Sequence, residues 1–214
     1  MHIAVFGGTF NPIHFAHLRI AEEVRERLSP EKVLFVPAFI PPHKDADTAA
    51  PATRRLEMVR LAIAGNPAFE ASDIELRRLG VSYTIDTVRE LKTSNAGLSI
   101  SLIVGSDSFN SITTWRDFDG LIKEASFVVV PRPGNAVLQP SEALPVELAE
   151  KFWYDAVKGA YCNQYGTGVI YLETTLMDIS SSGIRKRFME GRSAKYLLPY
   201  NVIEYILGHG LYKK

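Results

Sequence analysis

The chain has 214 residues, of which 46% are hydrophobic and 22% are charged. This length and composition suit one α/β domain with a hydrophobic core, and neither a repeat nor a linker divides residues 1–214 into two domains. Lysine plus arginine and aspartate plus glutamate both number 24, so the net charge is zero. That balance argues against a general nucleic-acid or membrane-surface binder.

The single cysteine, Cys162, excludes an internal disulfide and fits a reducing compartment. The first residues show no leader pattern, and no apolar run approaches the ~20 residues of a membrane span. We therefore expect a cytoplasmic protein with neither nucleic acid nor membrane as partner.

The opening stretch combines a strand pattern with a glycine pair. Residues 3–6 are apolar and predict a buried strand, and Gly7 and Gly8 predict a sharp turn close to a bound group. A helical stripe runs from about His14 to Leu28. Strand, turn and helix start in this order aim backbone N–H groups and the positive end of the helix dipole at a phosphate.

His14 and His17 share one face of the first helical turn because they are three residues apart. Neutral imidazoles there could donate to phosphate oxygens, and protonated ones could offset developing charge. A metal site is an alternative, but a structural site needs about four ligands and the chain has few cysteines and histidines. A second alternative makes them surface residues, which the neighbouring glycines disfavour.

Residues 7–17 read Gly-Gly-Thr-Phe-Asn-Pro-Ile-His-Phe-Ala-His and resemble the signature of the nucleotidylyltransferase superfamily. The Gly-Gly-Thr-Phe start with histidine at position 14 is most similar to the bacterial nicotinate-nucleotide adenylyltransferases. In pantetheine-phosphate adenylyltransferases that position is usually threonine. A motif of this length is far more specific than a lone glycine pattern.

Residues 32–37 predict a second strand, parallel to the first with a right-handed crossover. A proline-stiffened loop with His43 and Lys44 follows, and then an amphipathic helix over 53–64. On local sequence alone, His43 and Lys44 could be a solvated loop tip. The resemblance implies instead that they lie near the active site. Short strands are expected at 69–72 and 74–76.

A Ser-Tyr-Thr triplet ending in Tyr83 and Thr84 precedes a predicted helix over 85–91. On local sequence alone this is an N-cap. The same helix start presents N–H donors, and the resemblance implies that the triplet borders the nicotinate pocket.

A predicted strand over 98–104 leads into Gly105 and Asp107. A carboxylate at this point suits ribose hydroxyls, although a helix cap is the alternative. Trp115 is either a core residue or a stacking platform, and the resemblance implies that it lies against the pyridine ring. Arg132 follows another strand, over 127–130, at the ligand edge of the sheet.

Between residues 134 and 172, the expected elements follow from local sequence patterns rather than from a motif. A variable loop is expected over 134–145, a helix over 147–157 and a last strand over 169–172. Residues 152–171 are rich in aromatics, which suits a core or, less often, an oligomer face.

Ile179, Ser180, Ser181, Ser182 and Arg185 form the second informative stretch. The serines predict a capped helix start, and an arginine one turn inside adds a guanidinium able to bind phosphate oxygens bidentately. A capped helix with surface basic residues is the alternative. The stretch resembles the family's C-terminal signature Ile-Ser-Ser-Thr/Ser-x-x-Arg, and a closing helix is expected at 200–207.

The resemblance covers essentially the whole chain and implies a Rossmann-like, doubly wound α/β fold. We expect a mainly parallel sheet of about five or six strands, helices on both faces, and a C-terminal helical segment from about residue 180 to 214 that completes the ATP site. The implied reaction transfers the adenylyl group of ATP to nicotinate mononucleotide, giving deamido-NAD and pyrophosphate. Mg²⁺ would be bound through phosphates and water, without protein ligands.

The residue assignments follow from that implied reaction. The catalytic residues are His14, His17 and Arg185. The ATP-binding residues are Gly7, Gly8, Thr9, Phe10, His14, His17, Gly105, Ile179, Ser180, Ser181, Ser182 and Arg185. The residues for nicotinate mononucleotide are His43, Lys44, Tyr83, Thr84, Asp107, Trp115 and Arg132. The alternatives are an adenylyltransferase with another acceptor, such as nicotinamide mononucleotide, and a non-catalytic nucleotide binder; a homo-oligomer is also left open.

Overall fold

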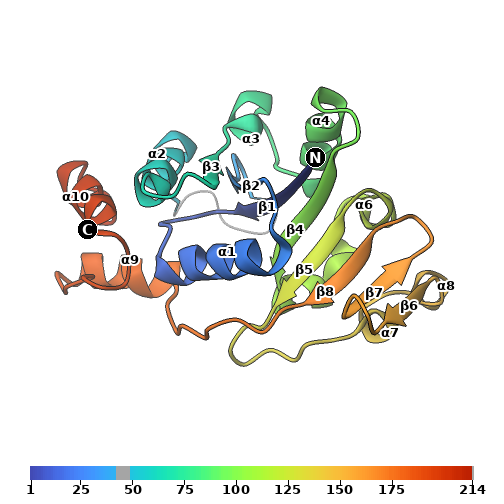
Figure 1. Ribbon diagram of the computed structural model, residues 1–214. Helices are drawn as coiled ribbons and strands as arrows, with labels where there is room; N and C mark the ends of the chain where they lie inside the picture. The colour runs from blue at the N-terminus through green and yellow to red at the C-terminus, as the bar shows by residue number, and fades with distance from the viewer. Residues whose placement is uncertain (42–48, 214) are drawn as a thin grey trace.

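A computed structural model describes residues 1–41 and 49–213. Across these residues the strands form one eight-stranded sheet in the order β3-β2-β1-β4-β5-β8-β7-β6 (Figure 1). The strands are β1 (His2–Gly8), β2 (Lys32–Pro37), β3 (Phe69–Ala71), β4 (Ser99–Gly105), β5 (Ser126–Val130), β6 (Phe152–Asp155), β7 (Ala160–Asn163) and β8 (Gly168–Tyr171). The α-helices are α1 (Phe15–Leu28), α2 (Ala52–Ile63), α3 (Ile74–Arg78), α4 (Thr84–Ser94), α5 (Ser106–Asn110), α6 (Phe118–Glu124), α7 (Pro140–Ala143), α8 (Val146–Ala149), α9 (Ser181–Met189) and α10 (Tyr200–Gly208).

The sheet is mainly parallel, as predicted. β1 pairs in parallel with β2 on one side and with β4 on the other, so the chain reverses its winding direction between β1 and β4. Ligands bind at such a switch point in open α/β sheets, outside the carboxyl ends of the strands. The fold therefore places the predicted site where β1 and β4 end.

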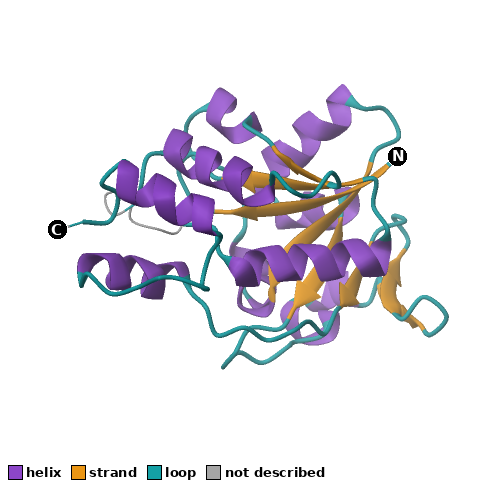
Figure 2. Ribbon diagram, turned by 60° about the vertical axis from the view of Figure 1, so that its left-hand side comes forward, coloured by secondary structure: helices purple, strands orange, loops and turns teal. Residues whose placement is uncertain are grey.

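Helices cover both faces of the sheet (Figure 2). On β1, Ile3 and Val5 pack into the core beneath α4 and α6, whereas Ala4 and Phe6 pack on the opposite face against α1, α2 and the C-terminal helices. Side chains alternate between the faces of a strand, so a strand segment buried on both faces is apolar throughout, as residues 3–6 of β1 are. The doubly wound prediction is confirmed.

The aromatic-rich segment differs from the prediction of a helix over 147–157. That helix, α8, ends at Ala149, and Phe152–Asp155 is instead strand β6. It pairs antiparallel with β7, and Tyr154 lies opposite Tyr161 with their ring centroids 5.2 Å apart. Cross-strand aromatic pairs stabilise a hairpin, which adds two strands to the five or six that we expected.

The second difference is at residues 74–76, which form part of helix α3 rather than a strand. The Nε of Arg77 lies 3.0 Å from Oδ1 of Asp73, an i,i+4 ion pair that favours a helical turn. The expected loop over 134–145 likewise contains the short helix α7.

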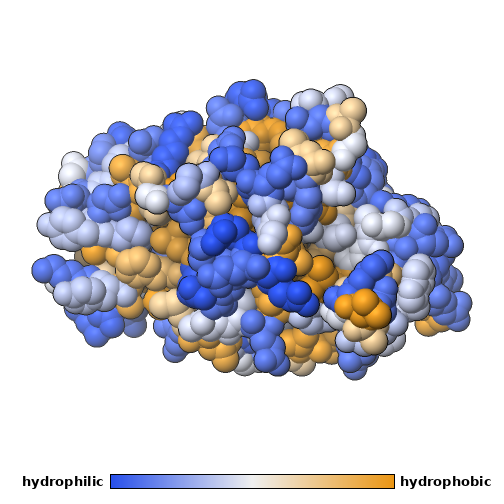
Figure 3. Space-filling view, viewed as in Figure 1, coloured by the Kyte–Doolittle hydropathy of each residue, from blue (hydrophilic) through white to orange (hydrophobic). Residues whose placement is uncertain are grey.

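The face of the molecule shown in Figure 3 is largely hydrophilic, with smaller hydrophobic areas between the polar ones. Exposed apolar side chains include Trp153, Tyr154 and Val157 at the β6–β7 hairpin, whereas Phe152 and Tyr161 pack against the core. Within the described ranges no helix has the length and apolar character needed to cross a membrane. The homo-oligomer stays a prediction.

Candidate active site

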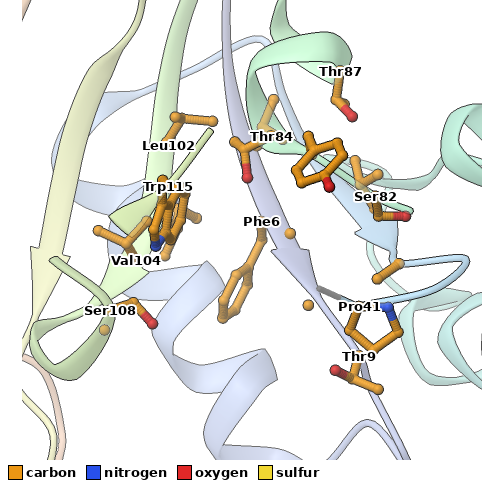
Figure 4. Close-up of a pocket in the computed structure, with 18 of the residues that line it drawn as sticks. Phe6, Thr9, Pro41, Ser82, Thr84, Thr87, Leu102, Val104, Ser108 and Trp115 are labelled. Atoms are coloured by element: carbon orange, nitrogen blue, oxygen red, sulfur yellow. The ribbon is translucent and has the colours of Figure 1, made fainter. Parts of the chain in front are cut away.

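A cavity of about 640 Å³ opens at the carboxyl ends of β1 and β4. In Figure 4, Thr9 and Ser108 lie toward one end, Thr84 and Thr87 toward the other, and Phe6 and Trp115 between them. Its wall contains predicted residues from four separate parts of the chain, namely Gly7, Gly8, Thr9, Tyr83, Thr84, Gly105, Asp107, Trp115 and Arg132. This volume suits a small-molecule ligand.

Two further predicted residues, His43 and Lys44, fall outside the described residues. The other predicted residues are not part of the cavity wall. They belong to the loop that follows β1, to the start of α1 and to the segment 179–185 that contacts this loop, and are Phe10, His14, His17, Ile179, Ser180, Ser181, Ser182 and Arg185. We call residues 9–14 the motif loop.

The motif loop turns at a residue other than the predicted glycines. Gly7 and Gly8 continue strand β1, and the left-handed backbone conformation is at Phe10, with φ of 46°. The Phe10 ring is 2% exposed, and a Cβ on Gly8 would lie 3.1 Å from it. The prediction of a turn at the glycine pair is therefore wrong. Gly8 makes room for the aromatic ring, and a Cβ on Gly7 would meet nothing within 4 Å.

His14 and His17 share one face, as predicted. Their rings stack with centroids 3.7 Å apart, and the backbone N–H of His14 donates to Nδ1 of His17 over 3.2 Å. His14 is the N-cap of α1. The ring of His17 also makes an edge contact with Phe10, with centroids 5.1 Å apart. Ring packing and the hydrogen bond at the start of α1 therefore fix the two imidazoles relative to each other.

Burial sets the charge of His14. Its side chain is 3% exposed, and burial, with a smaller effect from the positive charge of Arg132, lowers the pKa of His14 to about 4. Its Nδ1 is buried without a hydrogen-bond partner among the described residues. Such groups are rare and costly. His14 is therefore neutral at pH 7 and suits a hydrogen-bonding role rather than that of a cation.

Helix α9 starts against the motif loop. Ser180 Oγ accepts from the N–H of Gly183 and caps the helix. Ser181 Oγ donates to the carbonyl of Pro12 over 2.8 Å, and Arg185 Nη1 donates to the carbonyl of Asn11 over 2.9 Å. Two segments from opposite ends of the sequence are thus in contact, with the start of α9 and the Arg185 guanidinium against the backbone of the motif loop.

The C-terminal tail also reaches the motif loop. Asn11 Oδ1 accepts from the hydroxyl of Tyr212 over 2.6 Å and from the N–H of Ala50 over 3.1 Å. Burial raises the pKa of Tyr212, so the hydroxyl stays a donor. Sequence reasoning missed Tyr212, because nothing local to the tail indicates a contact with residue 11.

Gly105 allows two charged side chains to cross the end of β4. A Cβ on Gly105 would lie 2.8 Å from Arg132 Nε and closer still to Asp107 Oδ1. The two groups lie 3.7 Å apart as an ion pair, and the N–H of Arg132 donates to Ser106 Oγ. The glycine is needed here for close approach, and the Asp107 carboxylate and the Arg132 guanidinium belong to residues that line the cavity.

The far end of the cavity is the start of α4. Tyr83 is its N-cap and Thr84 its first residue. Trp115 packs partly against the core and also lines the cavity; its role as a stacking platform stays a prediction. Arg116 was missed: its guanidinium carbon lies 4.6 Å from the centroid of the Tyr83 ring, and its Nη1 is 3.4 Å from Oδ2 of Asp86. Its position directly after Trp115 was the available signal.

Glu75 is a second wall residue that sequence reasoning missed, because residues 74–76 were assigned to a strand. It is 7% exposed, and its Oε1 accepts from the hydroxyl of Thr87 over 2.6 Å. Burial raises the pKa of Glu75. In the part of the chain that the structure describes, no three His, Cys, Asp or Glu side chains are grouped to hold a metal ion.

Comparison with known proteins shows the family of this chain. A family model described as cytidylyltransferase-like matches residues 5–187, so the fold and site define a nucleotidyltransferase of the cytidylyltransferase-like family. A relative from Geobacter metallireducens, named as a probable nicotinate-nucleotide adenylyltransferase, is 44% identical over 212 residues, covering 99% of this chain and 98% of that protein. One of the same name from Geotalea daltonii is 48% identical, with the same coverage. The chain belongs to the nicotinate-nucleotide adenylyltransferase family.

The fold has a solved counterpart. A nicotinic acid mononucleotide adenylyltransferase of Plasmodium falciparum, complexed with NaAD, superposes with a TM-score of 0.74 at 18% identity, covering 99% of this chain and 97% of that one. This similarity confirms the predicted fold class.

Proposed function

We propose that this protein transfers the adenylyl group of ATP to nicotinate mononucleotide, releasing pyrophosphate and forming deamido-NAD in NAD biosynthesis. One observation carries the proposal: a single cavity joins the glycine end of β1 to the start of α4 and Trp115, and Phe6 in its wall makes an edge contact with the His17 ring. A phosphate-binding end and an aromatic end in one cavity suit a reaction that joins a nucleotide to a pyridine mononucleotide. Membership of the family supports it.

The motif-loop end would hold the triphosphate. His14 and His17, with the N–H groups of the motif loop, would contact the α- and β-phosphates, and the start of α9 with Arg185 would hold the β- and γ-phosphates. The mononucleotide phosphate would attack the α-phosphorus in line, with pyrophosphate as leaving group. Catalysis then rests on positioning and on charge stabilisation rather than on a covalent intermediate.

Mg²⁺ fits this site as an ion held by phosphate oxygens and water, because Mg²⁺ retains several waters when it binds substrate phosphates and the described residues form no cage of three metal-ligating side chains. When bound, it would neutralise phosphate charge.

The far end would hold nicotinate mononucleotide. Trp115 would stack on the pyridine ring, Asp107 would accept from ribose hydroxyls, and Arg132 would face the mononucleotide phosphate. The carboxylate would meet the N–H groups of Tyr83 and Thr84 at the start of α4, where the helix dipole favours negative charge. The zero net charge and the single cysteine support a cytoplasmic enzyme with small-molecule substrates.

A pyrophosphate-release assay tests the proposal. The enzyme is incubated with ATP and Mg²⁺, together with nicotinate mononucleotide, nicotinamide mononucleotide, pantetheine phosphate or no acceptor. We expect release with nicotinate mononucleotide and a dinucleotide product of matching mass. Faster release with pantetheine phosphate would assign a different acceptor, and binding of ATP without release in any arm would indicate a non-catalytic nucleotide binder.

A further inference from the structure

Arg55 is an arginine buried beneath the motif loop. It lies on α2 and is 2% exposed. Its Nη1 donates to the carbonyl of Thr9 over 2.8 Å, its Nη2 to the carbonyl of Phe39 over 3.1 Å, and its Nε to the carbonyl of Ala50 over 2.9 Å. The fork of one guanidinium therefore joins three backbone segments: the motif loop, the chain after β2 and the chain before α2.

Burying such a charge is costly unless its donors are satisfied. No carboxylate of the described chain is hydrogen bonded to Arg55, and backbone carbonyls take its donors instead. An apolar side chain could fill this volume at lower cost, but it could not fix the direction of a peptide group. The contact with Thr9 is the informative one because Thr9 also borders the cavity.

Peptide geometry links Thr9 to the following N–H. A trans peptide is planar, with its C=O and N–H pointing in opposite directions, so a Thr9 carbonyl held by Arg55 turns the N–H of Phe10 to the opposite side. Phe10 itself has φ of 46°, a strained conformation for a residue with a side chain, which persists only where its surroundings enforce it. Two features enforce it here: the hydrogen bond from Arg55 to the Thr9 carbonyl and the burial of the Phe10 ring.

We propose that Arg55 is a positioning residue for adenylyl transfer, which holds the Thr9 carbonyl so that the N–H of Phe10 faces the phosphate site as a preorganised donor. The proposal rests on the proposed function. Arg55 touches no substrate in this account; it acts through the Thr9–Phe10 peptide. The gain is a donor that need not reorient as charge develops on the transferring phosphoryl group.

Two variants at this position and one neighbour test the proposal. Arg55→Gln removes the charge and most of the fork, and Arg55→Lys keeps the charge without the fork. The matched control is Arg54→Gln, because Arg54 is the exposed neighbour on the same helix, where it donates to the hydroxyl of Tyr205. Pyrophosphate release is measured with both substrates varied, and thermal unfolding is followed for each protein.

We expect kcat to fall about 10²–10³-fold in Arg55→Gln, the range for losing one preorganised donor. The kcat of Arg55→Lys should lie between those of Arg55→Gln and wild type, and its KM for nicotinate mononucleotide should stay within about threefold of wild type. Arg54→Gln should match wild type. Folded Arg55→Lys with an unchanged kcat would overturn the proposal, and so would failure of both Arg55 variants to fold, which would assign the side chain to stability alone. Lack of release by the wild type would refute the proposed function instead, so the two failures are distinguishable.

Discussion

The two ends of the cavity are built differently. At the motif-loop end, His14 and Phe10 are almost fully buried, and bonds from Ser181, Arg185 and Tyr212 converge on the loop backbone or on the Asn11 side chain. At the α4 end, Trp115 and Tyr83 are only partly buried. Under the proposed function, the buried end performs the adenylyl transfer and the more exposed end selects the acceptor.

The largest effect should come from His17, within the buried end. His17→Ala removes a ring that stacks on His14, and losing one preorganised transition-state donor costs about 10²–10³ in rate. We expect that loss in kcat with a cooperative unfolding transition retained. His209→Ala is the control, because His209 is exposed on the C-terminal side of α10. A His17→Ala enzyme within a few-fold of wild type would remove the catalytic role.

Next in size is the pH dependence of stability due to His14. Its pKa is about 6.5 unfolded and about 4 folded, so between these values the unfolded chain binds more protons and stability falls as pH falls. The shift corresponds to roughly 3 kcal/mol. Denaturant unfolding from pH 7 to pH 4 should show wild type losing about that much more than His14→Gln. Parallel curves for the two proteins would contradict the burial of a neutral His14.

Substitution of Arg185 should raise KM for ATP more than KM for the acceptor. Loss of charge-assisted hydrogen bonds costs roughly 1.5–3 kcal/mol, so Arg185→Ala should raise KM for ATP by about 10–100-fold. Arg185→Lys should recover only part of it, since an ammonium cannot bind bidentately. Arg187→Ala serves as the control on the same helix, because Arg187 donates to the carbonyl of Ser193 instead. Normal ATP affinity in both Arg185 variants would show that α9 is not a phosphate site.

The smallest effect should come from the α4 end. Stacking of an aromatic side chain on a ring is worth about 0.5–1.5 kcal/mol beyond the area it buries. Trp115→Ala should therefore raise KM for nicotinate mononucleotide by roughly tenfold while leaving KM for ATP almost unchanged. Trp153→Ala, at an exposed site on the β6–β7 hairpin, is the matched control. An equal rise in KM for both substrates would mean that the two ends are not separable.

Sequence patterns predicted the parts whose signals are local or belong to the family motif. The apolar run at 32–37 matches β2 residue for residue, and three consecutive serines place the start of α9. Of the first motif, Gly7, Gly8 and Thr9 line the cavity, and the second motif contacts the loop that follows them. The roles assigned to these residues stay predictions.

The remainder depends on contacts between distant residues. The hydrogen bond from Tyr212 to Asn11 joins positions 201 apart in the sequence. Nothing in the sequence around Arg55 distinguishes it from an exposed arginine, and only the structure shows that it is buried. The helix at residues 74–78 was missed because five residues are too few for periodicity to separate helix from strand. The turn was wrongly assigned to the glycine pair because a glycine can serve either a turn or close packing. Local sequence does not show that the Phe10 ring packs against Gly8.

Acceptor selection at the start of α4 is measured as kcat/KM of the wild-type enzyme for nicotinate and for nicotinamide mononucleotide, determined in parallel. The start of α4 offers donors and the positive end of a dipole, so a carboxylate is matched at both oxygens, whereas a carboxamide places an NH₂ against a donor. Sites that select polar groups in this way can discriminate by about 10⁴. We expect kcat/KM to be higher for nicotinate mononucleotide by a factor of that order. Near-equal values would contradict it and would show that the α4 end does not choose the acceptor.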